Sequence, residues 1–204
     1  MAIRIIAIIF IFWMAGCTGI GYLATSDPYK KLGQANSMMA EDRTLLAEDV
    51  IGQAMKIFVA NGDKKGMAWA YLMYGNLYKN YYYHNGKWTP KFEEMGTYDG
   101  TYMKSIHNFE KAQELFDKEG DDMGVVNSLL GIGNAYGLRN ERAKSCDYYQ
   151  QALSRYRTAK QQGKISNDYV VNQPNYSNIG EMIEAFIKKD NCVGFKEERA
   201  PPAR

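Results

Sequence analysis

The chain repeats itself at an interval of 58 residues, and this repetition limits its fold more than any other feature. The segment from Asn61 to Tyr78 matches the segment from Glu119 to Tyr136. Each segment begins with a turn sequence and continues with large side chains at helical spacing beside a glycine. The pattern predicts stacked helices whose backbones approach closely at the glycine. The matched pairs are Gly62 with Gly120, Asp63 with Asp121, Gly66 with Gly124, Gly75 with Gly133, Asn76 with Asn134, and Tyr78 with Tyr136.

A second pattern alternates with the first and sets one large side chain between two small ones, at spacings of four and then three residues. This spacing favours a second helix in each unit. Tyr78 precedes Ser105 by 27 residues, whereas Tyr136 precedes Ser145 by 9, so the first unit carries 18 extra residues. The second pattern occurs at Ala47, Ile51 and Ala54, at Ser105, Phe109 and Ala112, and at Ser145, Tyr149 and Ala152.

Local signals predict where the other helices begin and end. Asp27 followed by Pro28 is typical of a helix start, so we expect a helix over 28–40. Asp42 is expected to cap the next helix, which runs to about residue 61 and stops at Gly62. A last helix is expected over 174–189, where Tyr176 and Gly180 continue the first-helix pattern.

Together the two helix patterns resemble the tetratricopeptide repeat, in its longer-helix variant. The segments Asn134–Tyr136 and Tyr148–Leu153 are closest to the family consensus, and the resemblance covers about residues 41–160. It implies an all-α fold, a right-handed α-solenoid of two to three helix pairs over residues 28–192. The helix at 174–189 would be its C-terminal cap. A generic helical bundle is the alternative.

The resemblance also implies a binding surface, because family members line a concave groove with the first helix of each unit. Asn76 and Asn134 match the position at which the family often holds a peptide backbone, and a carboxamide both donates and accepts hydrogen bonds. The alternative is that they bond a neighbouring helix. Basic residues that grip a carboxylate in chaperone-binding members are not repeated here, which argues against a clamp for a peptide C-terminus. The residues expected to face a protein or peptide partner are Trp69, Leu72, Asn76, Lys79, Asn127, Leu130 and Asn134.

The insertion, taken as residues 79–101, is rich in aromatic residues and is expected to be a long loop that turns at Asn85 and Gly86. A loop of this kind between packed helices is a candidate binding element for protein or glycan. The alternative, which we favour, is that its aromatic side chains fold back onto the repeat, because exposed aromatics would be adhesive. Its candidate binding residues are Tyr81, Tyr82, Tyr83 and Trp88.

The N-terminus has the form of an export signal. Arg4 precedes an unbroken apolar run over residues 5–13, which is too short to span a bilayer as a mature helix. The segment Met14–Cys17 resembles the bacterial lipobox, in which the cysteine receives a diacylglyceryl group before cleavage. We therefore expect a signal peptide over 1–16, lipidated Cys17 with a tether over 17–27, and a flexible tail over 193–204. A plain signal peptide or an uncleaved anchor is the alternative.

Export would place the other two cysteines in an oxidising compartment. In stacked repeats, antiparallel packing would bring Cys146, near the start of a second helix, close to Cys192, just past the end of the next helix. We expect these two to form a disulfide, and two buried thiols are the alternative.

Catalysis and nucleic-acid binding find little support. The net charge is +2, and no block of Lys or Arg suggests a surface for nucleic acid. His84 and His107 are the only histidines, and neither has a partner at metal-binding spacing. We therefore expect a non-enzyme with no metal or cofactor beyond the lipid on Cys17.

These features together predict a lipid-anchored scaffold of the bacterial envelope that binds a protein or peptide. Thr18 after Cys17 indicates the outer membrane, with the protein facing the periplasm. By analogy of fold, the chain would serve as an assembly factor for an envelope machine such as a pilus, secretion or cell-wall system. Two alternatives remain open: a structural lipoprotein that associates with itself, and a module that binds glycan or peptidoglycan through the stretch from Tyr81 to Trp88.

Overall fold

The computed structural model describes residues 25–165 and 176–192, and every regular element in that part of the chain is a helix. The prediction of an all-α fold is confirmed for these residues. The signal peptide, Cys17, most of the tether and the tail at 193–204 lie outside them. The helices are α1 (Pro28–Ala40), α2 (Thr44–Ala60), α3 (Lys64–Lys79), α4 (Tyr81–Asn85), α5 (Thr89–Glu94), α6 (Met103–Lys118), α7 (Asp122–Leu138), α8 (Arg142–Gln161) and α9 (Ile179–Lys189).

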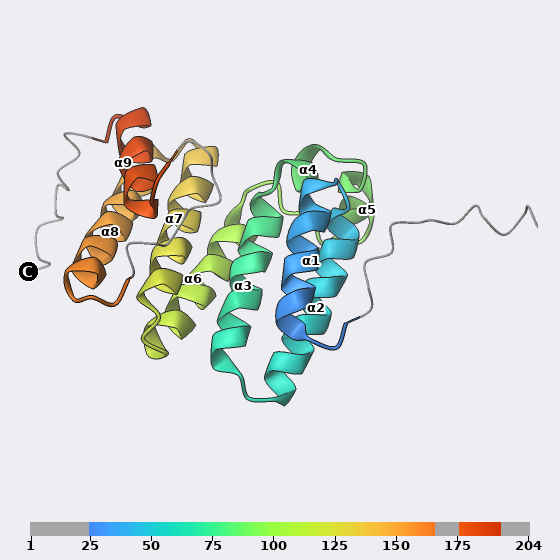
Figure 1. The fold of residues 1–204 in the computed structure, drawn as a ribbon. Coiled ribbons are helices and arrows are strands. Elements are labelled where there is room, and N and C mark those ends of the chain that lie inside the picture. Colours follow the sequence, from blue (N-terminus) through green and yellow to red (C-terminus); the bar gives the residue numbers. More distant parts are fainter. Residues whose placement is uncertain (1–24, 166–175, 193–204) are drawn as a thin grey trace, which may run out of the picture.

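The long helices form a row in which each packs against the next, from α1 to α9 (Figure 1). The short helices α4 and α5 stand together at one end of α2 and α3, so α3 packs directly against α6. The core forms two adjoining clusters, and α3 contributes to both, with Ala68 and Leu72 in one and Leu77 and Tyr78 in the other. None of the helices in the described ranges is both long and apolar enough to cross a membrane.

The matched repeat segments adopt matching local geometry. The Asp63 carboxylate accepts a hydrogen bond from the Gly66 amide at 2.7 Å, and the Asp121 carboxylate accepts one from the Gly124 amide at 2.9 Å. Each aspartate thereby caps its helix, α3 or α7. Gly62 and Gly120, which precede the two caps, have φ angles of 65° and 68°. The turn-and-helix reading of the repeat is therefore confirmed.

The repeated glycines let the helices approach closely, as the sequence predicts. A Cβ added at Gly75 would lie 2.6 Å from the Phe109 ring, and one added at Gly133 would lie 2.7 Å from the Tyr149 ring. A Cβ added at Gly131 would also lie 2.5 Å from the Phe109 ring, so this ring of α6 is in close contact with the backbones of both α3 and α7. The Ser105 hydroxyl, on the same helix, donates to the Gly75 carbonyl at 2.8 Å.

Two expected helix starts need correction, and one is confirmed. Asp27 caps α1 and accepts hydrogen bonds from the Tyr29 and Lys30 amides, as predicted. Asp42, by contrast, does not cap α2: its backbone is left-handed, with φ of 53°, and its carboxylate accepts from the Lys87 amide instead. The last helix begins at Ile179, five residues later than expected, because Asn178 provides its cap.

The sulfur atoms of Cys146 and Cys192 lie 2.01 Å apart, and the two Cα atoms are separated by 5.3 Å. The pair expected from antiparallel packing is therefore at disulfide-bonding distance. Both residues are fully buried, so the link ties the end of α9 to the first turns of α8 inside the core.

Candidate functional site

A pocket of about 430 Å³ opens where the last residues of α3, α7 and α9 meet α8. Lys79 and Asn134, both predicted to face a partner, line this pocket although they come from different repeat units. The structure therefore brings together two residues that the sequence analysis singled out separately. The other lining residues are Gly137, Leu138, Tyr149, Lys189 and Asp190.

Asn134 is held in place by the neighbouring helix. The Tyr149 hydroxyl donates a hydrogen bond to the Asn134 Oδ1 atom at 2.7 Å. For Asn134, this is the alternative noted from the sequence, in which the asparagine bonds a neighbouring helix. That bond uses the acceptor side of the carboxamide and fixes its orientation. The two N–H donors of the Asn134 amide have no hydrogen-bond partner within 25–165 and 176–192.

The pocket holds two ammonium groups and one carboxylate. Among the residues that the structure describes, neither Lys79 nor Lys189 has an ion-pair partner. Burial lowers the pKa of Lys79, because desolvation penalises a charged group that no counter-ion stabilises. Asp190, the one carboxylate, accepts a long hydrogen bond of 3.4 Å from the Ser145 hydroxyl.

A second pocket of about 400 Å³ adjoins the first and shares Gly137, Lys189 and Asp190 with it. Arg142 lines this second pocket and donates hydrogen bonds to the carbonyl oxygens of Asp190 and Asn191. This anchoring fixes the C-terminal end of α9, and with it the position of Lys189, relative to α8. Because the two pockets share these lining residues, they are referred to together as the recess.

The remaining predicted partner residues lie outside this recess. Leu72 and Leu130 are only 6% and 4% exposed and belong to the core, so they contribute to packing rather than to a surface for a partner. Trp69 is partly buried, and its ring meets the edge of Phe116 at 5.1 Å. Asn76 and Asn127 are partly exposed on α3 and α7 and do not line the pocket.

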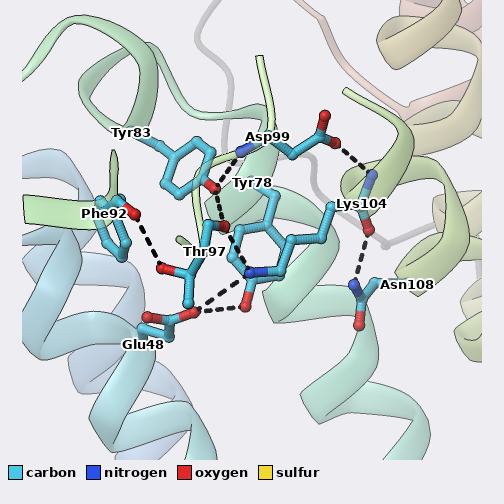
Figure 2. A network of polar contacts seen from close by, with 8 residues as sticks. All are labelled: Glu48, Tyr78, Tyr83, Phe92, Thr97, Asp99, Lys104 and Asn108. Atoms are coloured by element: carbon cyan, nitrogen blue, oxygen red, sulfur yellow. Dashed lines mark hydrogen bonds and ion pairs between the residues drawn. The ribbon is translucent and has the colours of Figure 1, made fainter. Parts of the chain in front are cut away.

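The insertion is partly helical, not the loop expected from the sequence, and a polar network holds it against the long helices (Figure 2). Tyr78 donates from its hydroxyl to Glu48 Oε1 at 2.6 Å, and Lys104 Nζ lies 3.7 Å from the same oxygen. Lys104 also lies 3.8 Å above the Tyr78 ring and donates to the Thr97 carbonyl. This network joins α2, α3, the insertion and α6.

The aromatic side chains of the insertion divide into buried and exposed groups. Tyr83 is fully buried, donates to the Thr97 carbonyl and accepts from the Asp99 amide, so it holds the insertion together. Trp88 is partly buried against the core of α1–α5. Tyr81 and Tyr82 are 69% and 36% exposed and meet edge to face. Tyr83 and Trp88 fold back onto the repeat, as in the alternative that we favour from the sequence. Tyr81 and Tyr82 remain at the surface.

His84 connects the insertion to α3. Its Nε2 atom lies 2.9 Å from the Tyr78 carbonyl, which fixes the proton on Nε2, and its Nδ1 atom lies 3.2 Å from the Tyr98 hydroxyl. The ring also contacts Tyr102, with centroids 4.2 Å apart. Burial lowers the pKa of His84, because this site stabilises the neutral ring.

The sequence pattern does not identify two further pocket residues, Lys189 at the end of α9 and Asp190 just after it. No periodicity points to them, since they stand at the end of the predicted helix and reach the pocket only through the packing of α9 on α8. Comparison with protein-family models, with curated proteins and with solved structures finds no match to this chain.

Proposed function

We propose that this chain is a lipid-anchored scaffold of a bacterial envelope, and that it binds a protein or peptide partner in the recess at the ends of α3, α7 and α9. The observation that carries the proposal is the convergence of Lys79 and Asn134 on one pocket. The repeat pattern alone predicts both residues as partner contacts, and it places them in separate repeat units. Two residues that contact the same partner in a groove must line the same pocket, and Lys79 and Asn134 do so.

The proposed architecture is a right-handed α-solenoid of tetratricopeptide-like repeats. Three observations support it: the matching aspartate caps, the matching glycine contacts, and the sequential packing of the helices. In this arrangement α1 with α2, α3 with α6, and α7 with α8 are the helix pairs, and α9 covers the last pair. The first helices of the pairs would then line the binding side.

The proposed location is the periplasmic face of the outer membrane, with lipid on Cys17. The lipobox-like segment Met14–Cys17 and Thr18 after it support this location. The disulfide-distance pair Cys146 and Cys192 agrees with an oxidising compartment. We propose no catalytic activity, cofactor or nucleic-acid partner.

Affinity capture from envelope extracts tests the proposal. Detergent-solubilised full chain would be compared with the double variant Lys79→Ala/Asn134→Ala, in which both residues line the pocket, and the bound proteins identified by mass spectrometry. We expect a partner that the wild-type chain captures and the double variant does not. Asn36→Ala, an exposed carboxamide on α1, is the matched control and should capture normally. A partner captured equally by all three chains would place binding on another surface.

The exposed Tyr81 and Tyr82 favour one second candidate, a module that binds glycan or peptidoglycan by aromatic stacking. Binding to purified sacculi, compared between the wild-type chain and Tyr81→Ala/Tyr82→Ala, tests it. Sedimentation of the wild-type chain over a range of concentrations tests the remaining alternative, in which the partner is a second copy of the chain.

A further inference from the structure

We infer that the molecule stands on the membrane by the end at which α1 begins, and that this end contacts anionic phospholipid headgroups. The surface consists of residues 27–31 and 56–65, and we call it the tether end. It lies opposite α4 and α5 (Figure 1). The inference rests on the proposed function, because it takes the lipid on Cys17 as given and adds which surface the membrane meets.

A short stretch of chain connects Cys17 to the tether end. Thr25 follows Cys17 by eight residues, and its hydroxyl accepts a hydrogen bond from the Asp27 amide at the start of α1. Eight residues reach at most about 29 Å, because an extended chain covers no more than about 3.6 Å per residue. The other end of α2 is about 25 Å farther away, since its 17 residues rise about 1.5 Å each. That end would therefore reach the membrane only if the connecting chain ran almost fully extended along the molecule.

Positive charge gathers at the tether end. This surface holds five lysines and only two aspartates, Asp27 and Asp63, which cap α1 and α3. Lys65 pairs with Asp121 of the neighbouring turn at 2.8 Å, and the surface remains positive after this pair is counted. Anionic headgroups attract such a cluster. The five lysines are Lys30, Lys31, Lys56, Lys64 and Lys65.

The opposite end of α1 and α2 carries the opposite charge. Residues 41–49 hold four carboxylates and one guanidinium group, and they remain acidic after the pairing of Glu48 with Lys104 is counted. The α6–α7 turn at 117–122 is also acidic, although Arg155 pairs with two of its four carboxylates. The positive surface is therefore confined to α1–α3, the part of the row that follows the tether.

Two exposed apolar side chains stand among these lysines. Tyr29 is 48% exposed and Val59 is 57% exposed. The Tyr29 ring lies 4.9 Å from the Phe58 ring, and its hydroxyl donates to the Asp63 carboxylate at 2.9 Å, so the ring is held at the surface. Tyrosine is enriched at the level of lipid headgroups, where its ring is apolar and its hydroxyl is hydrated. Exposed apolar groups surrounded by lysines are typical of a surface that contacts an anionic membrane.

This orientation turns the recess and the insertion away from the membrane. Helix α3 begins at the tether end and finishes at Lys79 in the recess, and its 16 residues span about 24 Å. The recess is thus held within one helix length of the membrane, and a partner would enter it from the aqueous side.

Fluorescence quenching on vesicles tests the orientation. Val59→Cys and Leu46→Cys each add one thiol at exposed positions near opposite ends of α2, about 20 Å apart along the helix. The lipidated full chain would carry a fluorophore on that thiol, because the other described cysteines are bonded to each other. The vesicles would contain phosphatidylcholine, phosphatidylglycerol and a lipid with a nitroxide headgroup. We expect loss of fluorescence at position 59 and no loss at position 46.

Lysine variants of the chain labelled at position 59 test the role of charge. Lys56→Gln/Lys64→Gln should reduce the loss of fluorescence, and so should vesicles of phosphatidylcholine without phosphatidylglycerol. Lys87→Gln/Lys188→Gln is the matched control, because these lysines are equally exposed but lie in the insertion and at the end of α9. It should keep the wild-type loss. Circular dichroism establishes that each variant is folded.

The inference is overturned if position 46 is quenched as strongly as position 59 on the vesicles, or if Lys56→Gln/Lys64→Gln keeps the loss seen in the control. A chain that does not float with the vesicles, or that takes up fluorophore at Cys17, would overturn the lipid anchor and the inference with it. If the chain is anchored and only the quenching pattern fails, the anchor stands. Capture of a partner through Lys79 and Asn134 is measured separately, so that part of the proposed function stands as well.

Discussion

Glycines in α3 and α7 hold aromatic rings of the next helix directly against the backbone. The Phe109 ring contacts both Gly75 and Gly131, so a methyl group at either glycine would overlap a ring that already contacts two helix backbones. Overpacking of this kind costs about 1–3 kcal/mol, which exceeds the gain in helix propensity of about 1 kcal/mol from replacing glycine. We therefore expect Gly75→Ala to lower the free energy of unfolding, measured by urea denaturation.

Gly33 is the matched control for this prediction. It lies inside α1, is exposed, and a Cβ added there would meet no atom within 4 Å. Gly33→Ala should therefore raise the free energy of unfolding by about 0.5–1 kcal/mol, the opposite sign to Gly75→Ala. Equal effects at the two positions would mean that the ring contacts of Gly75 do not control stability.

His84 makes the stability of the fold depend on pH. Its pKa in the folded chain is lowered from the ordinary value of 6.5, because burial penalises the charged ring more than the Tyr78 carbonyl and the nearby Asp99 stabilise it. Above 6.5 neither the folded nor the unfolded chain protonates this histidine, and its contribution to stability is complete. As the pH falls below 6.5 the unfolded chain takes up a proton that the folded chain resists, so stability is lost until the lowered pKa is passed.

Thermal unfolding of the wild type and His84→Gln between pH 7.5 and 5 measures this contribution. We expect the melting temperature of the wild type to fall more steeply with acidification than that of the variant. His107→Gln, at the exposed histidine on α6, should keep the wild-type slope. If the melting temperature of the wild type falls no more steeply with acidification than that of His84→Gln, His84 is not the cause of the pH dependence.

At the scale of elements, α9 depends on a covalent link more than the other long helices do. It has eleven residues, and its described helix contacts are mainly with α8. Joining Cys146 to Cys192 closes a separation of 46 residues, and a link of this length contributes about 2–4 kcal/mol to stability. The pocket needs this link because Lys189 and Asp190 lie at the end that it fixes.

We expect Cys146→Ala/Cys192→Ala to lower the free energy of unfolding by about that amount and to speed hydrogen exchange of the α9 amides. Exchange in α1 and α2 should change little, because the buried residues of these helices belong to the other core cluster. Adding reductant to the wild type should reproduce the effect. Alkylation of Cys192 in the non-reduced protein would contradict the link itself.

The sequence predicts helices and turns correctly where their signal lies in neighbouring residues. The prediction is wrong where contacts between distant parts of the chain determine the local structure. Gly75 with Gly133 and Asp63 with Asp121 recur at the 58-residue interval within matching segments, so the repetition reveals them. The helices α4 and α5 have five and six residues, too few turns for a periodic pattern. Asp42 has the composition of a cap, yet the Lys87 amide, 45 residues away, competes for its carboxylate.

At the scale of the whole molecule, the candidate recess is assembled from residues that sequence reasoning treats separately. Lys79 ends α3 and Lys189 ends α9, and only the packing of three intervening long helices brings both to one pocket. Asn134 could be selected by its repeat position, but its fixed orientation comes from the Tyr149 hydroxyl. A binding site formed at helix ends thus needs the tertiary structure, even where each helix is predictable.

The lipid proposed on Cys17 would hold the recess close to the membrane. Removing the lipid tests this proposal for the molecule as a whole. Residues 18–27 separate Cys17 from α1 along the chain, and we expect the proposed anchor to contribute nothing to the core. Each buried methylene of an acyl chain contributes about 0.8 kcal/mol to membrane binding, and several chains on one cysteine hold a protein firmly. Cys17→Ser should therefore abolish incorporation of labelled palmitate and the partition of the mature domain into detergent, while the thermal unfolding transition stays unchanged. Cys146→Ser/Cys192→Ser is the matched control. This variant should unfold at a lower temperature than the wild type and should still incorporate labelled palmitate. Palmitate incorporation that persists in Cys17→Ser would contradict the anchor, and with it the placement of the recess at the membrane.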